Sequence, residues 1–261
     1  MSRQNYYKQR TMRKKQAVDE SLILALVCQE RSIQPMLGAR KLLHLIRSDL
    51  KSANVSIGRD RFLGLLSAHN LLIERKKRYC LTTNSRHGFE VYKNIRKDCV
   101  TTGPHQVLVS DITYIRTGQT FVYLALVMDA HSRAIVGFDC SDSLEAVGAL
   151  RALSMAVKQL PAESAAIHHS DRGIQYCCKA YIKKLKKSKL RISMTEENHC
   201  YENSQAERLN GIVKQEYGLG ATFANKTDAY EAVRQAVWLY NHRRPHQKLG
   251  NEFPMTVHAA A

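Results

Sequence analysis

Three short apolar runs, rich in β-branched and aromatic residues, lie in the middle of the chain at 106–115, 121–129 and 134–139. Two turn-like segments, Arg116-Thr-Gly-Gln119 and Ala130-His-Ser-Arg133, separate them. Apolar runs broken in this way are typical of β-strands joined by tight turns. The pattern therefore predicts a three-stranded meander.

After the meander, segments with helical spacing alternate with short apolar runs. Residues 143–158 are expected to form a helix with Ser143 as its N-cap and Leu144, Val147, Leu150 and Leu153 on its apolar face. A strand at 165–168, a helix at 175–187, a strand at 190–194 and helices at 203–217 and 228–240 follow. This order predicts an α/β fold, with a mixed sheet layered by helices.

The first hundred residues have helical spacing only. A polar, basic segment at 1–18 precedes an apolar helical run at 19–28, and residues 38–47 place Leu42, Leu43 and Ile46 on one face. A polar stretch at 48–55 separates this helix from the next, which Ser56 is expected to cap.

That next helix places basic and apolar residues on different sides. Arg59 and Arg61 are expected to point outward, and Phe62, Leu65 and Leu66 inward. Two short helices, the second of them basic, make a helix-turn-helix pattern, although a generic helical bundle fits it too. The basic run that follows could form a wing and includes Arg75, Lys76 and Lys77.

Basic residues are concentrated in this region. The 261-residue chain has a formal net charge of +17. Residues 1–98 hold 21 Lys/Arg against 8 Asp/Glu, a net charge of +13, whereas residues 99–261 hold 19 against 15, a net charge of +4. A concentration of basic residues favours a polyanionic partner, because each cation on a phosphate releases counterions. The N-terminal third is therefore expected to bind nucleic acid.

Two classes of protein are disfavoured by what the sequence lacks. No apolar run reaches the roughly 20 residues that a membrane span needs, and the basic N-terminus is not followed by a secretion signal. The seven cysteines are odd in number and contain no Cys-x-x-Cys pair, so neither a disulfide framework nor a cysteine-based zinc site is expected. We expect an intracellular protein.

Three acidic residues lie within or beside the predicted elements. Asp111 lies within the first strand, flanked by apolar residues, where burial is costly unless something neutralises its charge. Asp171 follows the fourth strand in a loop with Gly173, and Glu207 lies on the 203–217 helix. Each alone would be interpreted as a surface carboxylate or a helix cap. Together they form the kind of oxygen-ligand set that suits two Mg²⁺ ions for phosphodiester chemistry.

The blocks around these acids resemble the retroviral-integrase-like transposases, and more narrowly the second-reading-frame product (OrfB) of the insertion sequence 3 family. The blocks are Ser110-Asp-Ile-Thr-Tyr114, His169-Ser-Asp-Arg-Gly-Ile-Gln-Tyr176 and Asn203-Ser-Gln-Ala-Glu-Arg-Leu-Asn-Gly-Ile-Val-Lys214. The 35 residues between Asp171 and Glu207 match the family's spacing, and 240–250 fit its C-terminal signature. The resemblance spans nearly the whole chain.

The resemblance implies a ribonuclease-H-like catalytic core preceded by a helix-turn-helix region. The expected domains are a basic DNA-binding region at 1–98, the core at 99–220 and a C-terminal helix and tail at 221–261. Asp111, Asp171 and Glu207 would hold two Mg²⁺, which Mn²⁺ can replace. The enzyme would hydrolyse one strand at each transposon end, and the freed 3′-hydroxyl would attack another phosphodiester without a covalent protein–DNA intermediate.

The resemblance also implies partners and a location. Double-stranded DNA, both transposon ends and target, is the expected substrate, bound by a homo-oligomer in the bacterial cytoplasm near the nucleoid. An upstream-frame (OrfA) product is a further expected partner, because this chain shows no leucine-zipper heptads. The expected DNA contacts are Lys214, Arg208, His169, Arg59, Arg61, Arg75, Lys76, Lys77, Arg243 and Arg244.

Other readings account for part of the sequence. The histidine and cysteine spacing of a retroviral zinc module is absent from the N-terminal region, and His169 is interpreted as a loop or DNA-contact residue rather than a zinc ligand. A ribonuclease H or junction nuclease would explain the acids but not the blocks around them. A non-catalytic DNA-binding regulator or domesticated transposase would be favoured by the loss of any of the three acids, and all three are present.

Overall fold

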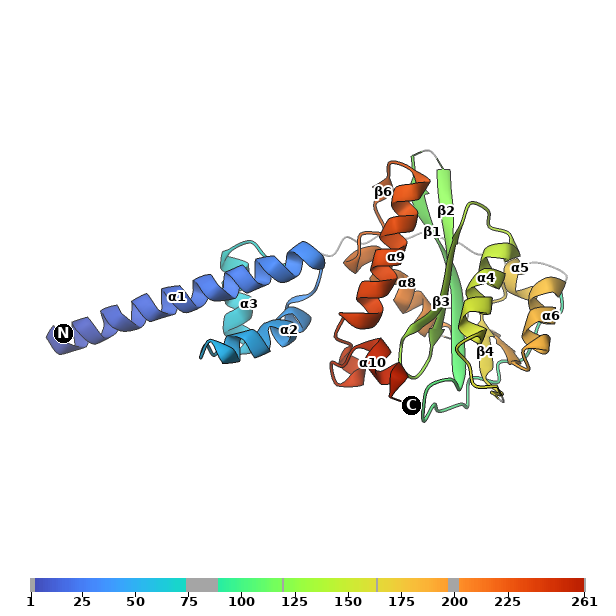
Figure 1. Cartoon of the computed structure of the whole chain (residues 1–261), viewed down its shortest axis with the longest axis horizontal. Helices are drawn as coiled ribbons and strands as arrows, with labels where there is room; N and C mark the ends of the chain where they lie inside the picture. The colour runs from blue at the N-terminus through green and yellow to red at the C-terminus, as the bar shows by residue number, and fades with distance from the viewer. Residues whose placement is uncertain (1–2, 74–88, 119, 163, 197–201, 261) are drawn as a thin grey trace. The chain divides into compact units, whose positions relative to one another are not determined.

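The computed structural model describes residues 3–73, 89–118, 120–162, 164–196 and 202–260 (Figure 1). These form two compact units, an N-terminal unit within residues 1–76 and a C-terminal unit within residues 77–261. The wing expected at Arg75, Lys76 and Lys77 lies outside the described residues. No helix among the residues described is long and apolar enough to cross a membrane.

The described residues of the N-terminal unit form three helices, α1 (Arg3–Ile33), α2 (Ala39–Ser52) and α3 (Arg59–Ala68). Leu42, Leu43 and Ile46 of α2 are buried, as the apolar spacing predicts. Helix α2 continues to Ser52, so most of the polar stretch expected to separate the helices is itself helical. The predicted Ser56 cap is wrong, because Gly58 occupies the N-cap position of α3.

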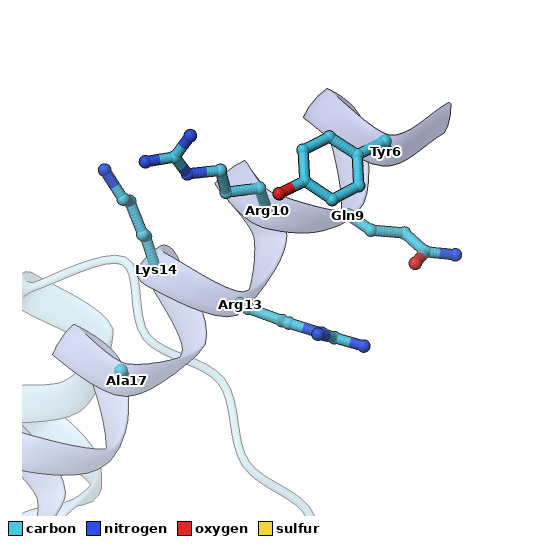
Figure 2. A pocket seen from close by; sticks show the side chains of 6 residues that line it. All are labelled: Tyr6, Gln9, Arg10, Arg13, Lys14 and Ala17. Atoms are coloured by element: carbon cyan, nitrogen blue, oxygen red, sulfur yellow. The ribbon is translucent and has the colours of Figure 1, made fainter. Parts of the chain in front are cut away.

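Helix α1 joins the basic segment and the apolar run into one element of 31 residues. Only its C-terminal half has a core, where Ile23 and Val27 are buried against α2 and α3. Residues 3–18 are all exposed and contain six Lys or Arg and no acidic residue. Figure 2 shows the side chains of Tyr6, Arg10, Arg13 and Lys14 projecting from this half. We call residues 3–18 the basic half of α1.

The C-terminal unit is built on a mixed sheet. Strands β1 (Val107–Thr117), β2 (Thr120–Asp129) and β3 (Ile135–Ser141) form the predicted antiparallel meander. Strands β4 (Ile167–Ser170) and β5 (Arg191–Met194) extend it in the order β3-β2-β1-β4-β5, with β4 parallel to β1 and β5 parallel to β4. The short β6 (Thr222–Phe223) pairs with the far end of β1.

Helices cover both faces of the sheet. On one face, α8 (Ser204–Glu216) and α9 (Lys226–His242) bury the apolar side chains of β1 and β2. On the other face lie α4 (Ala146–Val157) and α6 (Lys179–Lys187), which follows the single turn of α5 (Ile174–Cys177). The 3₁₀ turn η1 (Gln247–Leu249) and α10 (Pro254–Ala259) end the described chain. The predicted fold class, a mixed sheet layered by helices, is confirmed.

Helix α4 packs through small residues together with part of the predicted apolar face, since Leu153 is buried and Leu150 packs against the same core. Leu144 and Val147 are 40% and 51% exposed, whereas Ala149, Ala152 and Ala156 are buried. The cause is a close approach to β3, because a Cβ atom at Gly137 would come within 2.1 Å of the Ala152 carbonyl oxygen. Larger side chains on this face would force the helix away from the strand.

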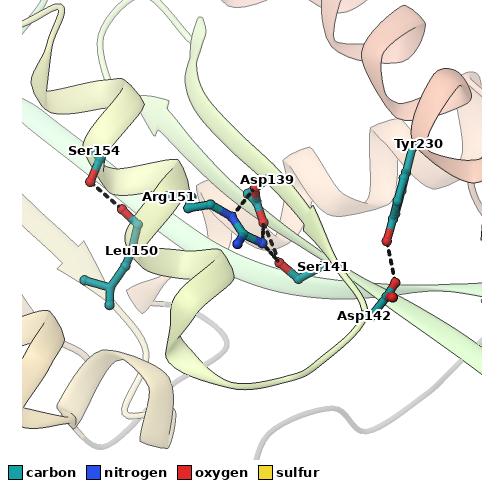
Figure 3. A network of polar contacts seen from close by, with 7 residues as sticks. All are labelled: Asp139, Ser141, Asp142, Leu150, Arg151, Ser154 and Tyr230. Atoms are coloured by element: carbon teal, nitrogen blue, oxygen red, sulfur yellow. Dashed lines mark hydrogen bonds and ion pairs between the residues drawn. The ribbon is translucent and has the colours of Figure 1, made fainter. Parts of the chain in front are cut away.

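Polar contacts fasten the same helix to the end of β3 (Figure 3). Arg151 donates two hydrogen bonds to Asp139, at 2.8 and 2.9 Å, and a third to Ser141 Oγ at 2.8 Å. Beyond β3, Tyr230 of α9 donates to Asp142, and Lys226 Nζ lies 2.9 Å from the same carboxylate. Helices on opposite faces are thus both held at one end of β3.

Candidate active site

The sheet topology brings Asp111 and Asp171 together. Asp111 lies midway along β1, the central strand, where it pairs with Leu126 of β2. On its other side β1 runs parallel to β4, with Val107–Val109 opposite Ile167–His169. Strand β4 therefore ends at Ser170 close to the level of Asp111, and Asp171 is the next residue. The Gly173 N–H donates to Asp171 Oδ1 at 2.9 Å, which orients this carboxylate.

Helix α8 brings Glu207 toward Asp111. Two asparagines fasten this helix to β1. Asn203 Nδ2 donates to the Ser110 carbonyl oxygen at 3.1 Å, and Asn210 Nδ2 donates to Asp111 Oδ2 at 2.8 Å. Glu207 lies three residues before Asn210, so the two side chains share a helical face. The asparagine that orients Asp111 therefore also fixes the helix that presents Glu207.

Electrostatics show that the three carboxyl groups influence one another. Burial and then the Asp171 carboxylate raise the pKa of Asp111 to about 8, and Glu207 adds to this effect. Hydrogen bonds from the Ile112 N–H and from Asn210 oppose the rise. Burial and then Asp171 also raise the pKa of Glu207. Asp111 and Asp171 are partly buried and Glu207 is exposed, and a cation between these like charges would stabilise them.

The donor set fits a hard divalent cation. All three side chains offer carboxylate oxygens, the ligands that Mg²⁺ prefers, and none offers nitrogen or sulfur. The raised pKa of Asp111 measures how unfavourable its charge is when no cation is present. The residues that could hold such an ion are therefore Asp111, Asp171 and Glu207.

A buried histidine supports β1 from beneath the site. His168 of β4 makes hydrogen bonds through Nε2 with Ser110 Oγ at 2.8 Å and with the Tyr181 hydroxyl at 3.0 Å. Burial and then His169 lower the pKa of His168 to about 3, so the ring stays neutral. The contact holds the residue before Asp111 in place without adding charge.

A segment ahead of the sheet braces the approach to α8. Asn94 donates through its backbone N–H to Glu196 Oε1 at 2.9 Å and through Nδ2 to Glu202 Oε2 at 3.0 Å. Arg96 Nη1 donates to the Glu202 carbonyl oxygen at 3.1 Å, and the Arg96 N–H to Ser193 Oγ at 3.2 Å. Neither this brace nor the hydrogen bonds of Asn203 and Asn210 were predicted from the sequence. Asn203 and Asn210 lie seven residues apart on either side of Glu207, and only this spacing could have suggested their hydrogen bonds.

Two of the expected DNA contacts are buried instead. His169 is 0% exposed, and its Nδ1 is hydrogen-bonded to Ser193 Oγ at 2.9 Å. Arg244 is 4% exposed and makes a two-fold ion pair with Glu216, at 2.7 and 3.0 Å. Both side chains are committed to packing within the C-terminal unit, so the structure argues against DNA contact through either.

The other expected contacts reach the surface to different degrees. Arg208 is exposed beside Glu207, and Arg243 is half-buried. Lys214 is half-buried too, with its ammonium 4.2 Å from the centre of the Tyr114 ring. In the N-terminal unit, Arg59 pairs with Asp60 at 2.8 Å and Arg61 with Glu20 at 3.3 Å, in exposed contacts that water screens.

The integrase core domain family matches residues 101–200, and a second family described as integrase core domain matches residues 188–254. A 31 kDa protein of insertion element IS600 from Shigella sonnei is 31% identical over 97% of this chain and 93% of its own length. The IS629 transposase from the same organism is 32% identical over 85% of this chain and 74% of that protein.

A third relative and a solved structure extend the comparison. The transposase InsF of insertion sequence IS3A from Escherichia coli K12 is 34% identical over 67% of this chain and 60% of its own length. The simian T-cell lymphotropic virus intasome, solved with the PP2A regulatory subunit B56 gamma, contains a chain with a TM-score of 0.51 and 15% identity. That match covers 89% of this chain and 74% of the other, and it bears on the fold alone.

Proposed function

This chain belongs to the IS3-family insertion-sequence transposases with an integrase core domain, and on that premise we propose that Asp111, Asp171 and Glu207 are its catalytic residues. The observation that carries the proposal is geometric: the β1–β4 register sets Asp171 beside Asp111, and Asn210, on the same face of α8 as Glu207, donates a hydrogen bond to Asp111. The substrate is double-stranded DNA at the ends of the element and at its target.

The reaction has two chemically similar parts. In the first, water attacks a phosphodiester at the end of the element, and the P–O bond to the 3′ oxygen breaks to leave a free 3′-hydroxyl. In the second, that hydroxyl attacks another phosphodiester, so one P–O bond forms as another breaks. Two Mg²⁺ ions, which Mn²⁺ can replace, would supply activation of the attacking oxygen and stabilisation of the leaving one.

The residues of the chain position these events. Hydrogen bonds from Asn210 and from the Gly173 N–H orient the carboxylates of Asp111 and Asp171, which lowers the cost of arranging them around a cation. Arg208, exposed beside Glu207, and Lys214, seven residues along the same helix, would neutralise phosphate charge near the acids. Cleavage of a labelled element end by the purified chain, with Mg²⁺ and then with a chelator, tests the assignment.

The proposed reaction requires more than one copy of the chain. Because two ends of an element must be processed and joined together, we propose that the chain acts as a homo-oligomer on DNA. An upstream-frame product that adds further DNA recognition is proposed as a partner. A regulator without catalysis is the weaker alternative, because it would not require the charge of a partly buried Asp111 to be held beside that of Asp171.

Asn210 should act as a positioning residue for Asp111. Replacing it with Ala removes the 2.8 Å hydrogen bond to Asp111 Oδ2, one of the two that lower the pKa of that carboxyl. We expect the Mg²⁺ concentration for half-maximal cleavage to rise about tenfold, the usual effect of losing a partner of a metal ligand. Titrating cleavage rate against Mg²⁺ measures it, with Gln215→Ala, exposed on the same helix, as control. An unchanged Mg²⁺ requirement would contradict the role.

The basic half of α1 should contact DNA phosphates. Replacing Arg10, Arg13 and Lys14 together with Ala should lower the slope of log affinity against log salt by about 2 to 3, because each phosphate contact contributes about 0.9. Binding of duplex DNA between about 50 and 200 mM salt measures the slope. A matched control replaces three neutral, exposed residues of the same half with Ala, namely Gln9, Thr11 and Gln16. Equal slopes in both variants would refute the contact.

A further inference from the structure

A second group of metal-ligating side chains lies outside the acidic site. In the part of the chain that the structure describes, one group of three such residues brings its ligand atoms within 4.8 Å of one another, and it consists of His105, Asp129 and His258. Asp129 ends β2 opposite Leu108 of β1. Asp111 lies three residues further along β1, roughly 10 Å at 3.3 Å per residue. The group is therefore separate from the three catalytic carboxylates.

Asp129 is a buried carboxylate with one oxygen nearly unused. It is 0% exposed, and its Oδ1 accepts from the His131 N–H at 3.0 Å and from both the N–H and the hydroxyl of Ser132, at 2.7 and 2.9 Å. Its Oδ2 accepts only from the His105 N–H, at 2.8 Å, among the hydrogen bonds described. Three of these four hydrogen bonds go to Oδ1, so Oδ2 retains room for a further ligand.

The neighbouring hydroxyl decides which nitrogen of His258 holds the proton. Ser132 uses its hydroxyl hydrogen on Asp129, so its oxygen faces His258 Nδ1, 3.0 Å away, as an acceptor. Nδ1 must then be the protonated nitrogen, and Nε2 of the neutral ring has a bare lone pair. His258 is 7% exposed, and Nε2 is buried without a hydrogen-bond partner. A lone pair buried in this way is costly unless a cation or a donor meets it.

This pattern is the one that metal-binding histidines use. One ring nitrogen is fixed by a hydrogen bond, here through Ser132 to Asp129, which leaves the other free as a ligand. The His105 ring lies beside the His258 ring, with centroids 4.5 Å apart at 64°. The His105 backbone is held in the left-handed region, at φ 64°, where its N–H reaches Asp129. The second imidazole is thus placed by the same carboxylate.

We propose that His105, Asp129 and His258 bind a divalent transition-metal cation of the Zn²⁺ type at a structural site. Two imidazole nitrogens and one carboxylate oxygen suit Zn²⁺ rather than Mg²⁺, which prefers oxygen. His105 is half-exposed, so water can fill the fourth position. The cation joins α10 at the end of the described chain to the residues just before β1 and to the end of β2. It therefore fastens the C-terminal helix onto the sheet.

The test separates this site from the catalytic acids. In the Asp111→Asn/Asp171→Asn background, the protein is equilibrated with micromolar Zn²⁺, dialysed and analysed for bound zinc. One zinc per chain is expected in this parent and after His131→Gln, a change in the same turn outside the group. His105→Gln should lose most of the bound zinc after dialysis, and its Kd for zinc should rise at least tenfold. Because His105 is half-exposed, this variant should fold even if His258→Gln does not.

A second readout links the ion to folding. Zinc should raise the Tm of the parent and of His131→Gln, and leave the Tm of His105→Gln unchanged. Zinc content or affinity in His105→Gln equal to that of the parent would overturn the proposal. A parent that retains no zinc would overturn it as well. Either result would leave the acidic site untouched, because that site is already disabled in the proteins compared.

Discussion

Replacing Asp111 with Asn, Asp171 with Asn or Glu207 with Gln should each lower metal-dependent strand cleavage by about a thousandfold or more. Each substitution removes an oxygen ligand while keeping nearly the same volume. Charge stabilisation by bound metal is worth several kcal/mol, and each ~1.4 kcal/mol is tenfold in rate. DNA affinity should stay within about twofold, because most of it comes from basic residues that these changes leave intact.

The measurement is the initial rate of nicking at a labelled element end, with DNA binding measured on the same preparations. Glu231→Gln is a suitable control, since Glu231 is an exposed helical glutamate of the same unit that pairs with Arg234 at 2.6 Å. It should cleave at the rate of the unaltered chain. If any one of the three variants keeps more than about a tenth of the normal rate in Mg²⁺, its residue is not a catalytic ligand.

The metal-free chain should lose stability as the pH rises from about 4 to about 8. The folded pKa of Asp111 is raised from 3.8 to about 8, first by burial and then by Asp171. The unfolded carboxyl titrates near its ordinary pKa, so within this window folding takes up a proton. The contribution of the protonated Asp111 carboxyl to the free energy of unfolding is therefore complete below about pH 4, and it is lost as the pH rises through about 8.

Asp111→Asn should remove this pH dependence. The amide is neutral at every pH, so without metal the variant should match the unaltered chain near pH 4. Near pH 8 it should be more stable by about 2 kcal/mol, since a pKa unit corresponds to ~1.4 kcal/mol and the side chain is only partly buried. Urea unfolding in chelator at both pH values measures the difference. Equal free energies of unfolding for Asp111→Asn and the unaltered chain at pH 8 would show that the fold does not raise the pKa of Asp111.

Much of the fold could be predicted from periodicity. The three strands of the meander and the buried faces of α2 and α3 follow directly from where the apolar residues fall. Helix α4 shows the limit of this reasoning. Most of its buried face is made of small residues, with Leu153 as the one large side chain, because Gly137 lets the strand approach closely. That approach is a tertiary contact, which the spacing of Leu144 and Val147 cannot reveal.

The site could be predicted only in part, because its sequence blocks do not reveal tertiary contacts. The acids could be picked out by their sequence blocks, but the hydrogen bonds of Asn203 and Asn210 depend on how α8 meets β1. His169 looked like a contact residue because its block lies beside the acids, yet burial and Ser193 hold its ring inside.

Long-range assembly is the hardest feature to foresee. His105, Asp129 and His258 are separated by 23 and 128 residues, and no spacing rule connects them. They meet because β2 ends beside the start of β1 and α10 returns to that same place.

The most direct test of the central claim is strand transfer by the purified chain, alone and with its upstream-frame product. The substrates are a labelled element end with a free 3′-hydroxyl and a target duplex, and the buffer contains Mg²⁺. Asp171→Asn is the control. We expect covalent joining of the labelled end to the target, dependent on Mg²⁺ and absent in the control. Joining that persists in Asp171→Asn, or none from either preparation although the DNA is bound, would contradict it.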